Sequence, residues 1–138
     1  MGHFVIDGSV TVAWFIPEER TSRTQALLDK VIEAGAVVPF HWWIEVGNAL
    51  LVATRRARIS VAQCQRALTQ LDALQLMTDP EALDRLWTAT LDLADRFRLT
   101  LYDACYLELA LRRGLPLATL DRDLTAAGQA LGLTLLDV

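Results

Sequence analysis

Short apolar runs that alternate with helical segments are the feature that most constrains how this chain folds. The first run, His3–Ile6, is followed directly by Asp7, and a later one, residues 115–120, is followed by Asp121. Each run has the length of a buried strand and is separated from the next by segments with helical periodicity. This alternation predicts an α/β fold, in which a mostly parallel sheet is covered by helices on both faces.

The pattern predicts the individual elements to within a few residues. The expected strands, about five in number, comprise residues 3–6, 36–38, 76–77, 117–119 and 134–136. The expected helices comprise residues 9–15, 21–34, 42–56, 60–74, 83–97, 102–113 and 124–131. Ser9, Thr21 and Ser60 stand where N-cap residues are favoured. No repeat or linker interrupts the order, so residues 1–138 are expected to form a single domain.

Composition restricts the location and the partners that are expected for such a domain. Hydrophobic residues make up 53% of the chain, yet no run is long enough to span a membrane. The surplus apolar surface is expected to meet a second copy or another protein. The tryptophan-rich stretches around Trp14 and Trp42 either pack in the core or line a groove for a partner's helix. Cys64 and Cys105 lack CxxC spacing, which favours a reduced, cytoplasmic location.

Four carboxylates, distant in the chain, are predicted to meet at one edge of the sheet. They are Asp7, Glu45, Asp103 and Asp121. Residues that follow parallel strands line the crevice where α/β proteins bind ligands. Acids gathered there repel one another unless a cation lies between them, which predicts a divalent metal site. Such a cation would also offset the formal net charge of −4, which otherwise disfavours a nucleic-acid partner.

Asp7 and Glu45 each allow a second interpretation. The segment Asp7-Gly8-Ser9 is also an ordinary strand-to-helix turn, in which Ser9 caps the helix or hydrogen-bonds Asp7 or a metal-bound water. Glu45 either faces solvent with Asn48, three residues further along the helix, or is a ligand that Asn48 supports by a hydrogen bond. The apolar surroundings of Glu45 favour the ligand, since a buried carboxylate needs a partner.

Asp103 and Asp121 are also candidates for helix capping. Asp103 follows Thr100 at capping-box spacing, and a carboxylate in a first helical turn also projects toward the crevice. Asp121 and Asp123 are two positions apart and are expected to point in different directions, so only one is a ligand. Asp121 is favoured because it lies nearer the strand end, where Thr119 can orient a water or a phosphate oxygen.

Taken together, these segments resemble the PIN-domain ribonucleases, and most closely the VapC-type toxins of VapBC toxin–antitoxin pairs. Residues 4–10, Phe-Val-Ile-Asp-Gly-Ser-Val, resemble the first motif of that family, and Glu45 with Asn48 resembles the second. Residues 102–106, Tyr-Asp-Ala-Cys-Tyr, resemble the third, and residues 119–124 the fourth. The resemblance covers essentially the whole chain, with all four motifs in the family's order.

The resemblance implies a three-layer α/β/α sandwich and a PIN-like nuclease domain over residues 1–138. It implies Mg²⁺ or Mn²⁺ as cofactor, RNA as substrate and a homodimer. It also implies a cognate antitoxin as partner, and contact with DNA only through that antitoxin. Asp7, Asp103 and Asp121 then are metal ligands, and Glu45 is a ligand or orients the attacking water. Ser9, Asn48 and Thr119 are supporting residues in this interpretation.

Two other interpretations remain open. A catalytically silent PIN-like scaffold that binds protein or RNA has the same pattern, although the complete set of acids argues against it. A receiver or phosphohydrolase-like α/β module also places acids at strand ends. Such a module normally has a lysine near the phosphate, and the single lysine, Lys30, belongs to an early helix.

Overall fold

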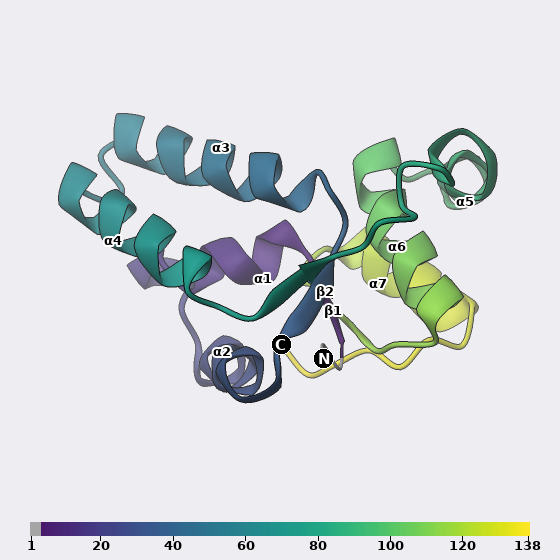
Figure 1. The fold of residues 1–138 in the computed structure, drawn as a ribbon, viewed down its shortest axis with the longest axis horizontal. Helices are drawn as coiled ribbons and strands as arrows, with labels where there is room; N and C mark the ends of the chain where they lie inside the picture. The colour runs from purple at the N-terminus through teal and green to yellow at the C-terminus, as the bar shows by residue number, and fades with distance from the viewer. Residues whose placement is uncertain (1–3) are drawn as a thin grey trace.

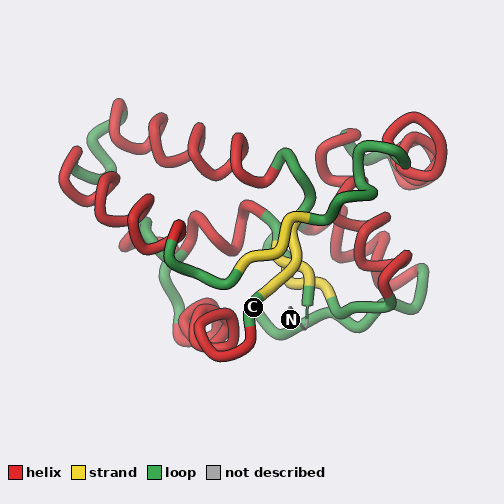
Figure 2. The backbone as a smooth tube through the Cα atoms, viewed as in Figure 1, coloured by secondary structure: helices red, strands yellow, loops and turns green. Residues whose placement is uncertain are grey.

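The structure, a computed structural model, describes residues 4–138. Four parallel strands form one sheet in the order β3-β2-β1-β4. Their bounds are β1 Val5–Ile6, β2 Ala36–Val38, β3 Leu76–Thr78 and β4 Leu117–Ala118. Figure 2 shows these strands at the centre of the molecule, with helices on either side. The predicted α/β class and parallel sheet are confirmed; the start of the first strand at His3 lies outside the described residues.

The helices cover both faces of the sheet. They are α1 Gly8–Ala13, α2 Ser22–Ala34, α3 Trp42–Arg55, α4 Val61–Asp72, α5 Leu91–Phe97, α6 Leu101–Arg113 and α7 Arg122–Ala130, with a 3₁₀ turn at Pro17–Glu19. In Figure 1, α1, α3 and α4 lie to the left of the strands and α5, α6 and α7 to the right. This arrangement is the expected three-layer sandwich. No helix within residues 4–138 is long and apolar enough to cross a membrane.

Local sequence explains where most helices begin. Thr21 caps α2 and Ser60 caps α4, each in a reciprocal capping box with the residue three positions later. The cap at Ser60 was predicted, and Thr21 was predicted to begin its helix. The prediction for α1 was wrong, because Asp7 is the cap and Ser9 lies inside the helix. The Asp7 carboxylate accepts a hydrogen bond from the Val10 N–H, a role in which Asp is at least as effective as Ser.

Two further predictions need correction. The sheet has four strands rather than about five, because residues 134–136 form only an isolated bridge between Leu135 and Leu117. The single helix predicted over residues 83–97 is instead a π-helical turn, Leu86–Thr90, followed by α5. In that turn the Thr90 N–H bonds the Arg85 carbonyl, five residues back, which widens the helix where it packs against α6.

The strand order places a topological switch point between β1 and β4. The chain leaves β1 toward the layer that contains α1, whereas it leaves β4 toward α7 in the opposite layer (Figure 1). The loops after these neighbouring strands therefore diverge at the carboxyl edge of the sheet, the place where α/β proteins commonly bind ligands. The Asp7 backbone N–H donates to the Ala118 carbonyl at 3.2 Å, which holds the two strand ends together there.

A largely buried ion-pair network joins the end of β3 to α6. Arg112, whose side chain is 13% exposed, contacts Asp79 at 2.6 Å, Glu108 at 2.7 Å and Glu81 at 2.8 Å. Arg113 also contacts Asp79, whose side chain is fully buried. Although burial opposes its ionisation, the two arginines hold the pKa of Asp79 below its ordinary value. These contacts compensate charges that would otherwise be costly inside the fold.

We predict that Arg112→Met lowers the free energy of unfolding by about 3 kcal/mol at pH 7, because it leaves the Asp79 and Glu108 carboxylates inadequately paired. Urea denaturation measures this loss, which should shrink toward pH 4 as the unpaired carboxylates become protonated. Arg66→Met, at an exposed position on α4, is the control. A loss no larger than that of the control would show that the network does not support the fold.

Candidate functional site

Asp7 lies at the switch point between β1 and β4. It follows β1 directly and is only 3% exposed. One carboxylate oxygen accepts hydrogen bonds from the Ser9 hydroxyl at 2.6 Å and the Val10 N–H at 3.2 Å. The other accepts a hydrogen bond from the Thr119 hydroxyl, which comes from the residue after β4. The carboxylate is thus fixed from both sides of the switch point.

Ser9 and Thr119 connect the two diverging loops. The Ser9 hydroxyl donates to Asp7 and accepts from the Leu120 N–H at 2.9 Å. The Thr119 hydroxyl donates to Asp7 and accepts from the Asp121 N–H at 3.0 Å. Ser9 therefore joins Asp7 to the loop after β4, whereas Thr119 donates across to Asp7 and accepts from its own loop. Of the three residues predicted as supporting, Ser9 and Thr119 lie next to Asp7.

Glu45 reaches the same region from the first turn of α3. The Tyr106 hydroxyl on α6 donates to its Oε1 at 3.2 Å, and Nε2 of His41 lies 3.7 Å from its Oε2. A Cβ atom at position 8 would lie 2.0 Å from Oε1, so the absence of a side chain at Gly8 permits this approach. The carboxylate therefore lies directly against the start of α1.

The predicted support of Glu45 by Asn48 was wrong in its geometry. Asn48 is exposed on α3, and among the described residues the side chain that hydrogen-bonds Glu45 is Tyr106. Burial and the Glu45 charge raise the pKa of Tyr106, so its hydroxyl stays protonated and continues to donate. Tyr106 lies in the third motif quoted from the sequence, one helical turn after Asp103, and that spacing was the available signal for its role.

Asp103 and Asp121 lie at the N-terminal ends of two helices. Asp103 is in the first turn of α6, where its N–H donates to the Thr100 hydroxyl at 3.1 Å. Asp121 caps α7, and its Oδ1 accepts from the Leu124 N–H at 2.8 Å. The capping interpretation of Asp121 is therefore correct, and its second carboxylate oxygen remains available for another role. Asp123 lies exposed in the first turn of the same helix.

The pKa values of Asp7, Glu45 and Asp103 are raised, mainly by burial and further by neighbouring acids. Burial raises the pKa of Asp7 to about 6, with a smaller contribution from the Asp103 charge, against the opposing effect of its three hydrogen bonds. Burial also raises the pKa of Glu45, and the charges of Asp7 and Asp103 add to this. The pKa of Asp103 is raised by burial, then by Asp121 and Asp123. Mutual repulsion thus links Asp7, Glu45, Asp103 and the acids of α7 in one cluster of negative charge.

The donor chemistry of this cluster fits a hard divalent cation. Its potential ligands are all oxygens, which Mg²⁺ and Mn²⁺ prefer, and their repulsion would be relieved by positive charge. Within residues 4–138, however, no three acidic, His or Cys side chains are already arranged as a metal-binding group. Binding would therefore require carboxylates to turn toward one another, and Asp103 and Glu45, which are only half-buried, have the freedom to do so.

Three similarities to known proteins accompany this geometry. The family model described as PIN domain matches residues 4–129. The chain is 30% identical over 131 residues to Ribonuclease VapC3 of Pyrobaculum aerophilum, covering 92% of this chain and 95% of that protein. It also resembles the crystal structure of PAE2754 from Pyrobaculum aerophilum, with a TM-score of 0.67 and 29% identity over 91% of this chain and 86% of that one.

The raised pKa of Asp7 predicts a pH-dependent effect of Asp7→Asn on stability without metal. Because the pKa in the fold, about 6, exceeds the ordinary 3.8, ionisation costs stability as the pH rises through this interval. At pH 8 the variant should be more stable than the wild type, by up to about 3 kcal/mol, and near pH 4 the gain should vanish. Denaturant melts in EDTA measure this, with the exposed Asp95→Asn as control. A gain independent of pH would contradict the burial of the charge.

Proposed function

Because this chain belongs to the PIN domain family, we propose that it is a divalent-metal-dependent endoribonuclease that acts as the toxin of a type II toxin–antitoxin pair. The observation that carries the proposal is the buried Asp7, held at the switch point and surrounded by acids whose pKa values are raised. The similarity to a protein named Ribonuclease VapC3 supports RNA as the substrate.

In the proposed reaction each acid has a separate part. Asp7, Asp103 and Asp121 would hold Mg²⁺ or Mn²⁺, with Asp123 as the alternative to Asp121. When bound, the cation supplies charge relief for the transition state and makes the attacking water more acidic. Glu45, with its raised pKa, either joins these ligands or accepts the proton of the water. The water oxygen bonds to phosphorus as the bond to O3′ breaks, leaving a 5′-phosphate and a 3′-hydroxyl.

Local contacts supply the positioning that this chemistry needs. Ser9 and Thr119 hold Asp7 in one orientation, and Tyr106 donates a hydrogen bond to Glu45. A charge that is held in place before the reaction needs little reorganisation during it. Asp103 and Asp121 also lie at the N-terminal ends of α6 and α7, where the helix dipole favours negative charge.

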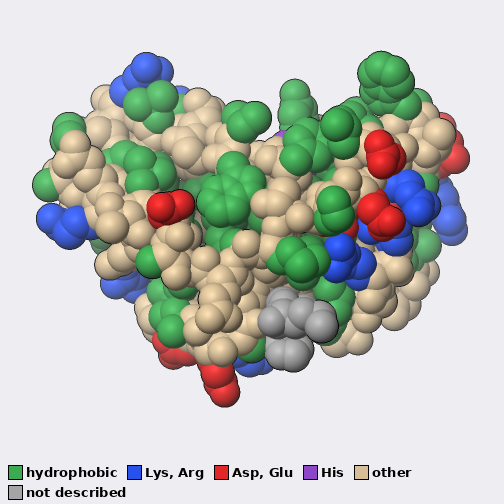
Figure 3. Space-filling model, in the orientation of Figure 1, with side chains coloured by type: hydrophobic (Ala, Val, Ile, Leu, Met, Phe, Trp, Pro, Cys, Tyr) green, Lys and Arg blue, Asp and Glu red, His purple; other side chains and the backbone are tan. Residues whose placement is uncertain are grey.

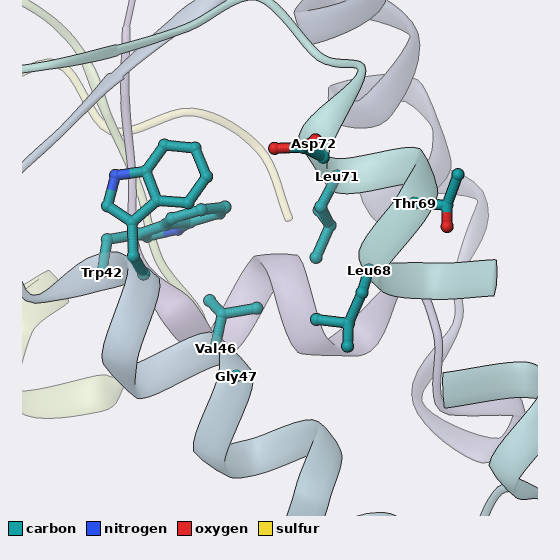
Figure 4. A pocket seen from close by; sticks show the side chains of 8 residues that line it. Trp42, Val46, Gly47, Leu68, Thr69, Leu71 and Asp72 are labelled. Atoms are coloured by element: carbon teal, nitrogen blue, oxygen red, sulfur yellow. The ribbon is translucent and has the colours of Figure 1, made fainter. Parts of the chain in front are cut away.

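We propose that the cognate antitoxin binds in a groove between α3 and α4. Figure 4 shows this groove, in which Val46 of α3 faces Leu68 and Leu71 of α4, and its volume is about 420 Å³. Trp43 and Leu68, which line it, are 40% and 45% exposed, whereas Trp14 and Trp42 are buried. An apolar trough between two helices suits the nonpolar face of a partner segment. Hydrophobic side chains are also spread over the face seen in Figure 3, and homodimerisation remains a prediction.

We predict that Asp7→Asn lowers the rate of RNA cleavage at least about a hundredfold, since the cation's contribution of several kcal/mol depends on this carboxylate. Cleavage of total RNA in Mn²⁺ measures the rate, and growth after induced expression gives a second readout. Asp95→Asn is the matched control. A folded Asp7→Asn protein that still cleaves RNA and arrests growth would contradict the proposed role of Asp7 and require a different nuclease site.

We also predict that Mg²⁺ or Mn²⁺ raises the melting temperature at pH 8. At ten times the dissociation constant the gain is about 1.4 kcal/mol, on the order of 5 °C for a domain of this size. Thermal melts with a KCl series of equal ionic strength separate binding from general screening. The shift should be smaller in Asp7→Asn, and equal shifts with KCl and Mg²⁺ would argue against a specific cation site.

A further inference from the structure

A small apolar cavity adjoins the cluster of acids on the side of α6. Its volume is about 290 Å³, and it lies between the loop that precedes α3, the π-helical turn and the start of α6. Its lining residues are Phe40, His41, Leu86, Leu101, Tyr102 and Cys105. The walls are almost entirely apolar or aromatic, with the imidazole of His41 as the main polar group.

His41 is buried without the hydrogen bonds that an imidazole normally makes. The residue is 7% exposed, and neither ring nitrogen has a partner among the described residues. Its ring packs against Phe40, Tyr102 and Tyr106 at centroid distances of 5.7, 6.0 and 4.9 Å. A buried donor or acceptor that remains unpaired is costly, so a bound group that pairs with it would be favoured at this position.

The same imidazole connects the cavity to the proposed catalytic acids. Nε2 of His41 lies 3.7 Å from Glu45 Oε2, and Tyr106, which packs on the His41 ring, donates to Glu45 Oε1. A nucleotide whose phosphate lies beside Glu45 therefore carries its base within reach of the cavity. Tyr102, at 67% exposed, presents an aromatic ring at the entrance.

We propose that this cavity holds one unstacked base of the RNA strand, next to the phosphate that is cleaved, and that His41 hydrogen-bonds the edge of that base. The inference rests on the proposed nuclease function and adds a recognition site to it. Proteins that read single-stranded RNA stack bases on aromatic side chains and bond their edges, and the cavity provides both groups. The base at this position then determines where the strand is cut.

A protein side chain fits the cavity less well than a base does. An aliphatic anchor from a partner helix would fill the apolar walls but leave both His41 nitrogens unpaired. A base has a flat apolar face for Tyr102 and both donors and acceptors on its edge for the imidazole. The apolar groove between α3 and α4, in contrast, is lined by residues suited to a nonpolar partner surface.

The test uses a pool of short single-stranded RNAs of random sequence, incubated with the full-length protein and Mn²⁺. Sequencing of the new ends gives the base preference at each position around the cut. The wild type should show a preference at one position that flanks the cut. Leu86→Trp, which fills the cavity, should reduce cleavage about tenfold and remove the preference at that position alone. Leu91→Trp, at an exposed position on α5, is the control and should change neither.

A second measurement changes the RNA instead of the protein. The preferred sequence is synthesised with an abasic nucleotide at the selected position, and the wild-type rate should fall about tenfold. With this substrate, Leu86→Trp should cause little further loss, because both changes remove the same contact. His41→Phe retains the ring but loses its nitrogens, so it should change which base is preferred.

The possible results are distinguishable. Leu86→Trp protein that folds, as shown by its melting temperature, and cuts with the wild-type preference would overturn the base site. Additive losses from the abasic nucleotide and Leu86→Trp would also overturn it. If Leu86→Trp instead weakens binding of the antitoxin and leaves the cut pattern unchanged, the cavity is a protein-docking site. If the wild type cuts no RNA with Mn²⁺, the nuclease proposal itself fails, and the base site fails with it.

Discussion

The hydrogen bonds that join Asp7 to both sides of the switch point organise the rest of the site. Asp7 follows β1 and Thr119 follows β4, and these strands are neighbours whose loops lead to opposite layers of the sandwich. One carboxylate, held by Ser9, Val10 and Thr119, therefore sets the position of the start of α1 and of the loop before α7. The other acids enter from α3, α6 and α7, whose N-terminal ends lie around this point.

This arrangement carries an energetic cost that is consistent with function. An acid whose pKa in the fold is about 6 is destabilising when ionised at neutral pH, and further acids nearby increase the cost. Elsewhere in the molecule the buried acids Asp79 and Glu108 are compensated by Arg112. The acids beside Arg112 are neutralised, whereas those around Asp7 are not. Such an uncompensated cluster of acids is typical of a binding site. In the proposed function a divalent cation would supply the missing charge.

Sequence patterns predicted the elements well and the contacts between them poorly. The strands around Val37 and Leu117 and the caps at Thr21 and Ser60 follow from local periodicity and side-chain chemistry. The bond between Tyr106 and Glu45 joins residues 61 positions apart, and the bond between Thr119 and Asp7 joins residues 112 apart. Rules based on neighbouring residues cannot predict contacts between residues so far apart in the sequence. The unpaired His41 was also beyond prediction, because burial of both its nitrogens depends on three separate segments that meet around it.

The central claim is that acids from four separate segments share one divalent cation. The most direct measurement is the anomalous diffraction of a crystal of the protein soaked in Mn²⁺. We expect a peak at about 2.1 Å from carboxylate oxygens of Asp7 and of at least one of Glu45, Asp103 and Asp121, after those side chains have turned toward it. A fully soaked crystal with no peak beside Asp7, and with the carboxylates still in their separate hydrogen bonds, would contradict the account.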